Sequence, residues 1–223
     1  TSEEASYHFN SINELSSKIE QTPGSPTLYF ARGLDYALVQ DINNALDNLD
    51  KAIEAKPDFV LAYFERANLR YRKINVEYAE NQNESETVTM AAKVVATSPL
   101  TARSKKGSSL EGISFGEKTF GMDYELVIRD YEKVLSLDPK FIYAWFNRGN
   151  IRCLQRDYRN ALIDFGKAIE LNPDFAEAWF NRGITQIYLG DRAHGISDLR
   201  MAGQLGLYKA YNLIKRFEDK TMD

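Results

Sequence analysis

Cysteine and histidine are scarce in this chain of 223 residues, which holds one cysteine and two histidines. A single cysteine, Cys153, excludes an internal disulfide and leaves the redox compartment undetermined. His8 and His194 lie near opposite ends of the chain, and neither has a metal-ligand spacing. Cys153 has no nearby histidine or aspartate in the pattern of a nucleophile motif, so we interpret it as a small apolar helix residue. We predict no metal site.

Motifs of cofactor and phosphate chemistry are also missing. The sequence contains neither a G-x-G-x-x-G nor a G-x-x-x-x-G-K-[ST] pattern. The segment 112–116, GISFG, fits the G-x-S-x-G pattern of a nucleophile elbow. That elbow requires a strand, a turn and a helix within an α/β sheet, and nothing in this sequence supplies them. We therefore predict that the protein is not an enzyme, with no catalytic residue and no cofactor.

Long apolar runs and an excess of positive charge are absent as well. No run approaches the roughly 18 apolar residues of a membrane-spanning helix, so we predict no membrane insertion. The formal charge of −4 and the pI of about 5.4 argue against general nucleic-acid binding. The chain begins at Thr1 without a methionine or a signal sequence, so we interpret it as a trimmed or mature fragment, in either the cytoplasm or the periplasm.

What the sequence does contain is repetition. The heptapeptide YAWFNRG at 143–149 recurs with one change as EAWFNRG at 177–183, a shift of 34 residues. Around Trp145 the spacing reads W-x3-G…A-x3-F-x2-A-x4-P, ending at Pro173. Small residues at these positions allow two antiparallel helices to approach closely, and the proline stops the second helix. This pattern resembles the tetratricopeptide repeat (TPR).

The same period organises most of the chain. The resemblance implies an all-α, right-handed superhelical solenoid of antiparallel helix pairs. The expected segments are a half-repeat or capping helix at 1–25, units at 26–59, 60–141, 142–175 and 176–209, and a capping helix at 208–223. The second unit holds an insertion at about 75–121, which we expect to form a small β-hairpin-like lobe, although Met90-Ala91-Ala92 would equally suit a helix.

Two places depart from a regular repeat. Nothing stops the helix that begins near residue 60 at the usual place, so it can run on through Tyr78 or Ala79. The fourth unit has Gly195 where alanine is expected, and Gly203 and Gly206 are expected to interrupt its end. Phe217 stands where a further repeat needs a small residue, so we expect the final helix to be a cap.

A charged pattern follows the same period. Arg32, Arg66, Arg148 and Arg182 precede the small residue of each first helix, and the second helices carry Asn48, Asp130, Asp164 and Asp198 at one common position. We hypothesise an arginine–aspartate pair inside each of the last three units. The alternative is that the arginines line a groove and bind carboxylates of a ligand.

The family resemblance also implies a binding surface, because TPR arrays hold a peptide or a partner helix on a concave wall of first helices. Carried over, the groove positions are Phe30, Leu34, Phe64, Asn68, Tyr71, Tyr143, Phe146, Asn150, Phe180 and Ile184. Aromatic anchors and amides suit an extended peptide. The alternative for the phenylalanines is packing between adjacent units. The carboxylate clamp of chaperone-binding TPRs is rejected, because Phe30 and Leu34 replace its first lysine and asparagine.

The sequence therefore predicts a non-catalytic protein–protein interaction module, a scaffold or adaptor that binds a peptide or partner segment in its groove, through the insertion, or both. One alternative is a regulatory or sensing segment of a longer multidomain protein. Another is a structural module that self-associates. The ending at 198–211, DLRMAGQLGLYKAY, resembles bacterial TPR proteins, particularly those of the Bacteroidetes. No nucleic-acid partner is expected.

Overall fold

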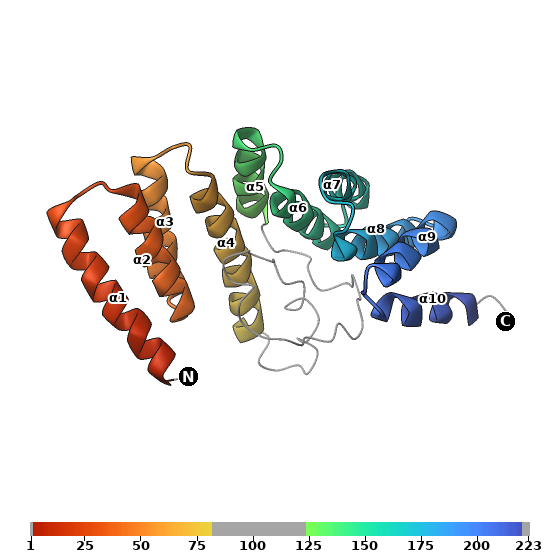
Figure 1. The fold of residues 1–223 in the computed structure, drawn as a ribbon, viewed down its shortest axis with the longest axis horizontal. Coiled ribbons are helices and arrows are strands. Elements are labelled where there is room, and N and C mark those ends of the chain that lie inside the picture. The colour runs from red at the N-terminus through yellow and green to blue at the C-terminus, as the bar shows by residue number, and fades with distance from the viewer. Residues whose placement is uncertain (1, 82–123, 220–223) are drawn as a thin grey trace. The chain divides into compact units, whose positions relative to one another are not determined.

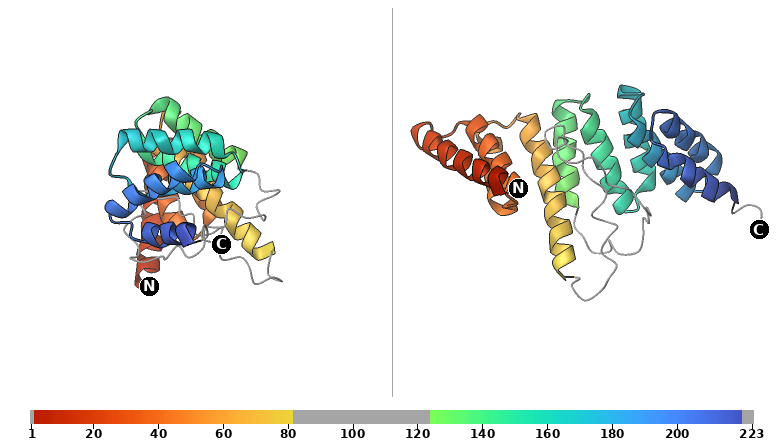
Figure 2. Two further views of the ribbon diagram at one scale, coloured as in Figure 1. Left: turned by 90° about the vertical axis from the view of Figure 1, so that its right-hand side faces the viewer. Right: turned by 60° about the horizontal axis from the view of Figure 1, so that its bottom comes forward.

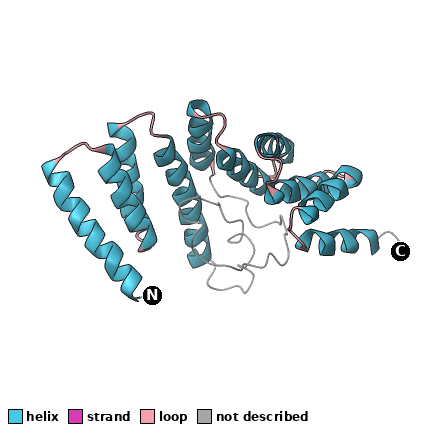
Figure 3. Ribbon diagram, viewed as in Figure 1, coloured by secondary structure: helices cyan, strands magenta, loops and turns pink. Residues whose placement is uncertain are grey.

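The computed structural model describes residues 2–81 and 124–219, and every regular element in these ranges is an α-helix (Figure 3). The fold class is therefore all-α, in agreement with the predicted solenoid of helix pairs. The β-hairpin-like lobe falls mostly on residues 82–121 and lies outside the described residues. The helices are α1 (Ser2–Gln21), α2 (Pro26–Leu38), α3 (Ile42–Ala55), α4 (Val60–Asn81), α5 (Glu125–Leu137), α6 (Ile142–Leu154), α7 (Tyr158–Leu171), α8 (Ala176–Tyr188), α9 (Arg192–Gln204) and α10 (Lys209–Asp219).

The described helices, which Figure 1 labels, are divided between two compact units. The first unit holds α1 to α5, and the second holds α6 to α10. Within each unit a helix packs mainly on its neighbours in the sequence, as the views of α1 to α4 and of α8 to α10 show (Figure 2). Short connections between consecutive helices make neighbouring helices antiparallel.

Three second helices start in the same way. An aspartate at the N-cap accepts a hydrogen bond from the backbone N–H three residues further on, which satisfies one of the free donors of the first turn. The pairs are Asp41 with Asn44, Asp157 with Asn160 and Asp191 with His194, at 3.1, 3.4 and 3.3 Å. These caps fix where α3, α7 and α9 begin.

A residue with left-handed backbone lies two positions after the end of each first helix in these pairs. Gln40 has φ 69°, Arg156 has φ 62° and Gly190 has φ 90°, and each directly precedes a capping aspartate. Only glycine adopts this conformation without a steric penalty. Helix α4 continues to Asn81, so residues 75–81 of the expected insertion are helical, as the lack of a stop signal suggested.

Close helix approach in the core depends on glycine. A Cβ atom on Gly149 would lie 2.7 Å from the ring of Phe165, which is fully buried. In the next pair, a Cβ on Gly195 would lie 2.6 Å from the carbonyl oxygen of Gly183, so α8 and α9 approach backbone to backbone. The glycine that departs from the repeat pattern at 195 is thus a requirement of packing in this pair.

The prediction that Gly203 interrupts the end of the expected fourth repeat, 176–209, is wrong. Gly203 lies inside α9, and the ring of Tyr211 from α10 covers it, with a Cβ at 203 expected 2.6 Å from that ring. The helix ends at Gln204, and Gly206, two residues further on, has φ 96° and is followed by a hydrogen bond of 2.9 Å from Leu207 N to Ala202 O. This is the geometry of a glycine-terminated helix.

Candidate functional site

In three helix pairs an arginine of the first helix binds an aspartate of the second helix, as hypothesised. Arg148 donates from Nε and Nη2 to both carboxylate oxygens of Asp164, at 3.0 and 2.7 Å. Arg66 binds Asp130 at 3.0 and 2.6 Å, and Arg182 binds Asp198 at 2.6 and 3.0 Å. In the first pair, Arg32 donates to Asn48 at 2.8 Å. The three predicted pairs are confirmed, and each is bidentate.

A second arginine joins two of these pairs. Arg152 donates to Asp164 at 2.8 Å, and Arg70 donates to Asp130 at 2.6 Å. The sequence reasoning missed both, although each lies four residues after the first arginine and hence on the same helix face. Burial raises the pKa of the Asp164 carboxyl, and the two guanidiniums oppose that shift.

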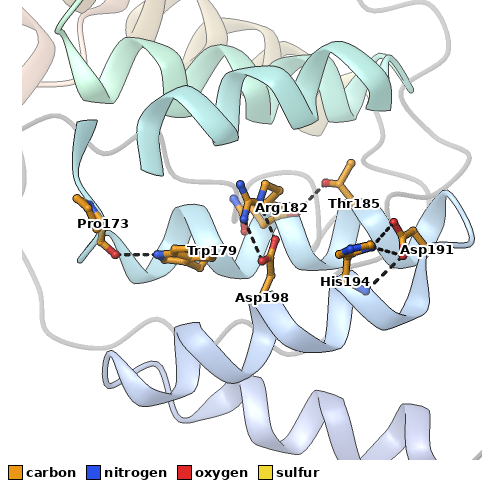
Figure 4. A network of polar contacts seen from close by, with 8 residues as sticks. Pro173, Trp179, Arg182, Thr185, Asp191, His194 and Asp198 are labelled. Atoms are coloured by element: carbon orange, nitrogen blue, oxygen red, sulfur yellow. Dashed lines mark hydrogen bonds and ion pairs between the residues drawn. The ribbon is translucent and has the colours of Figure 1, made fainter. Parts of the chain in front are cut away.

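The aromatic residue three positions before each arginine completes this arrangement. The guanidinium of Arg148 lies 4.9 Å from the ring centre of Trp145, and that of Arg182 lies 4.8 Å from that of Trp179. Trp179 also donates from its indole nitrogen to the carbonyl oxygen of Pro173 at 2.7 Å (Figure 4). Because these arginines bind aspartates of their own helix pairs, they form the frame of each pair.

Three of the predicted groove phenylalanines are buried in the core of the compact unit that contains them. Phe64 is fully buried, while Phe146 and Phe180 are each 4% exposed. The ring of Phe146 lies 5.9 Å from that of Phe165 and 4.7 Å from that of Phe175. These distances are those of a packed aromatic core.

The other predicted aromatic residues differ from one another in how far they are buried. Phe30 is half-buried, with its ring 4.9 Å from that of Phe59, and Tyr143 is half-buried, with its ring 5.8 Å from that of Phe175. Tyr71 is 5% exposed, and burial raises its pKa to about 12. Phe30 and Tyr143 are thus the aromatic positions that retain surface for a partner.

The two predicted asparagines are both hydrogen-bonded. Asn68 accepts from the Tyr131 hydroxyl at 2.7 Å, across α4 and α5. Asn150 on α6 accepts from the side-chain nitrogen of Asn181 on α8, also at 2.7 Å. Asn181 was not among the predicted groove positions, although the shared YAWFNRG and EAWFNRG heptapeptides place it one period after Asn147.

The Asn150–Asn181 amide pair retains unused hydrogen-bonding capacity. Within the described residues, the side-chain nitrogen of Asn150 and the side-chain oxygen of Asn181 have no hydrogen-bond partner. Asn150 is 5% exposed, whereas Asn181 is half-buried. The pair therefore offers one donor and one acceptor side by side, on neighbouring first helices of the second unit.

The one cysteine of the chain is shielded from solvent. Cys153 is 1% exposed and lies 3.4 Å from the Thr185 hydroxyl, and burial raises its pKa to about 12. Because the thiolate is the nucleophile, this thiol is unreactive at neutral pH. Among residues 2–81 and 124–219, no three histidine, cysteine or acidic residues gather as metal ligands. No described helix is long and apolar enough to cross a membrane.

Comparison with known proteins identifies the repeat. Residues 142–175 and 165–205 match models of the tetratricopeptide repeat. No curated protein gives a significant match.

Solved structures match over nearly the whole chain. A crystal structure of MamA has a TM-score of 0.61 and 14% identity, covering 90% of this chain and 89% of that one. MamA from Desulfovibrio magneticus RS-1 has a TM-score of 0.60 and 13% identity, covering 91% of this chain and 94% of that one. The TPR protein TTC0263 of Thermus thermophilus has a TM-score of 0.54 and 13% identity, covering 95% of this chain and 89% of that one. At these identities the likeness shows the fold.

Proposed function

We propose that this chain, a tetratricopeptide-repeat protein, is a non-catalytic module that binds an extended segment of a partner protein on the first helices of its second unit. TPR proteins are in general protein-interaction scaffolds. The special resemblance to Bacteroidetes proteins stays a prediction, and so do the expected unit boundaries.

The observation that carries the proposal is the Asn150–Asn181 amide pair. A peptide group presents one N–H donor and one C=O acceptor, and the pair presents one acceptor and one donor. Two hydrogen bonds to a single peptide group hold an extended backbone without reading its side chains. Specificity would then come from side-chain contacts beside the amides, and the half-buried Tyr143 is one candidate anchor.

The rigid frame around the amides supports the same function. Asn150 lies between Arg148 and Arg152 in α6, and both arginines bind Asp164 of α7. Asn181 directly precedes Arg182, which binds Asp198 of α9. Side chains held in this way lose little conformational entropy when a ligand binds, so preorganisation strengthens binding.

The non-catalytic part of the proposal rests on the chemistry of the second unit. Its one thiol is buried and protonated, and its most buried carboxylate, Asp164, is held by two arginines. Neither group is presented to a substrate. The buried phenylalanines Phe146 and Phe180 would support the surface from beneath, while Phe30, Phe64, Asn68 and Tyr71 are the predicted groove positions of the first unit.

Selection of random peptides on the purified chain tests this function. Peptides enriched from a phage-displayed library are synthesised and titrated calorimetrically against the wild-type chain and an Asn150→Ala/Asn181→Ala variant. We expect the double variant to bind at least about tenfold more weakly, since each lost hydrogen bond contributes roughly 1 kcal/mol. Asn212→Ala, an exposed asparagine on α10, is the matched control and should bind like the wild type.

Two results would refute the proposal: no peptide enriched over background, or enriched peptides that bind the double variant with wild-type affinity. Thermal unfolding of each variant shows whether the fold is kept. Substituting Phe146 would be a poorer test, because its burial means that the fold itself would be weakened.

A further inference from the structure

The two units carry formal charges of opposite sign. The described residues of the first unit include 10 lysines and arginines against 17 aspartates and glutamates, whereas those of the second include 12 against 9. The first unit is therefore strongly acidic and the second is basic, although the whole chain is only mildly acidic. Surfaces of opposite sign on one molecule favour contact between different copies of it.

The acidic character is exposed on α1. Glu3, Tyr7, Asn10 and Glu14 follow one another at spacings of three and four residues, so they share one face of the helix, and all four are exposed. Tyr7 is 70% exposed. Glu14 pairs with Lys18 of its own helix at 2.6 Å, which is a weak exposed contact. We call these four residues the acidic face.

The basic character is exposed on α10 and the turn before it. Tyr208 is 74% exposed and Tyr211 is 44% exposed, and Lys215 and Arg216 are exposed one turn further on. These four residues form the basic face. Each face thus combines charge of one sign with an exposed tyrosine, and the signs are opposite.

The repeat register relates the two faces more closely. Arg216 lies 34 residues after Arg182, at the position that binds an aspartate in the internal helix pairs. Glu14 lies 34 residues before Asn48, at the position that accepts from an arginine in those pairs. Within the described residues Arg216 has no hydrogen-bond or ion-pair partner. Each face therefore holds one half of the pair that recurs through the chain.

We propose that the partner of each face is a second copy of this chain, with the basic face of one copy against the acidic face of the next. Arg216 pairs with Glu14 across this contact, and Tyr7 and Tyr211 cover its apolar part. Phe217 and Lys18 stand where internal pairs have Gly183 and Ala52, so the two helices cannot approach as closely as those pairs do. The association is consequently weak, end to end and sensitive to salt.

Sedimentation equilibrium of the intact chain between about 10 and about 500 μM tests the proposal. This concentration range suits a weak contact whose dissociation constant is of roughly the same order. We expect concentration-dependent association in about 50 mM NaCl, weakened about tenfold in about 500 mM NaCl because exposed charges are screened. A Glu3→Lys/Glu14→Lys variant and a Lys215→Glu/Arg216→Glu variant should each be monomeric alone, and should associate when mixed. Lys167→Glu on α7 changes the same kind of exposed charge and should behave like the wild type.

A wild-type chain that stays monomeric at the highest concentration in low salt would overturn the proposal. Association that survives both charge reversals, or variants that do not associate on mixing, would overturn it equally. Circular dichroism melting curves confirm that the reversed chains are folded. Peptide capture by Asn150 and Asn181 is measured separately, so either proposal can fail without the other.

Discussion

At the scale of single residues, glycines in the second unit differ in what surrounds them. A Cβ at Gly195 would meet Ile187 at 2.5 Å and the Gly183 carbonyl oxygen at 2.6 Å, whereas a Cβ at Gly166 would meet only an Arg182 nitrogen at 3.9 Å. Gly195→Ala should therefore destabilise the fold by about 2 kcal/mol or more, and Gly166→Ala should stabilise it by about 0.5–1 kcal/mol. Urea unfolding of the two variants checks both signs, and equal effects would refute the argument.

Left-handed turn residues allow a second comparison at this scale. Gln40 has φ 69° and Gly190 has φ 90° at corresponding turns. Gln40→Gly should stabilise the chain by up to about 1 kcal/mol, because the Cβ penalty of a left-handed residue exceeds the entropy that glycine adds to the unfolded chain. Gly190→Ala should destabilise it by a similar amount. Unfolding midpoints that move in the same direction would contradict this reasoning.

A buried thiol and a buried phenol predict how the stability of the fold changes with pH in the alkaline range. Burial raises the pKa of both Cys153 and Tyr71 to about 12. A group with a raised folded pKa contributes stability below its unfolded pKa and loses it as pH rises towards the folded value. Stability should thus fall from about pH 9 for Cys153 and about pH 10 for Tyr71, by roughly 1.4 kcal/mol per pH unit for each group.

The cysteine part of that prediction has a direct control. Cys153→Ala removes one of the two titrations, so its urea midpoint should fall less steeply between about pH 9 and about pH 10.5 than that of the wild type. Parallel curves for the two chains would show that the thiol does not titrate as its burial implies. Dithionitrobenzoate should label Cys153 in the native wild type only at the rate of local opening.

At the scale of helix pairs, the arginine–aspartate contacts connect the two members of each pair. Asp164 is fully buried and binds two arginines, whereas Asp198 is nearly buried and binds one. Asp164→Asn should destabilise the chain by about 3–5 kcal/mol, since it leaves two guanidiniums without a counter-charge. Asp198→Asn should cost less. Asp174→Asn, at an exposed turn, is the control, and chemical denaturation gives all three values.

The order of these three effects is the informative result. If Asp164→Asn were no worse than Asp174→Asn, the contacts would be incidental to stability, and the hypothesis that they hold the helix pairs together would fail. An Arg152→Met variant measures separately how much the second arginine contributes to stability. The family pattern alone does not reveal this arginine's contact with Asp164.

The sequence allowed the helix pairs and their charged contacts to be predicted, because a fixed period places equivalent residues in equivalent surroundings. The period alone matches Arg148 with Asp164, and the two side chains are hydrogen-bonded. Periodicity did not determine whether Phe146 is buried or exposed. A residue at this repeat position lies between two helix pairs, where both core side chains and solvent are within reach. It also missed the Asn150–Asn181 contact, which joins different positions of successive repeats. The fit of Tyr211 over Gly203 depends on a single terminal helix and has no counterpart to compare with.

At the scale of the whole molecule, coupling runs along the sequence, because each helix packs mainly on its neighbours in the chain. In such a repeat fold, stability is approximately a sum of local terms and nearest-neighbour contacts. Damage at one pair should therefore decay with distance along the array.

Hydrogen exchange of the Asp164→Asn chain measures this decay. We expect amide protection to fall most in α6 and α7, less in α8 and α9, and least in α2 and α3 of the first unit, because only neighbouring pairs share an interface. The exposed Asp174→Asn variant provides the baseline in the same unit. A uniform loss of protection from α2 to α9 would mean that the helices unfold as one cooperative body, and nearest-neighbour packing would then be too weak a description of what stabilises this fold.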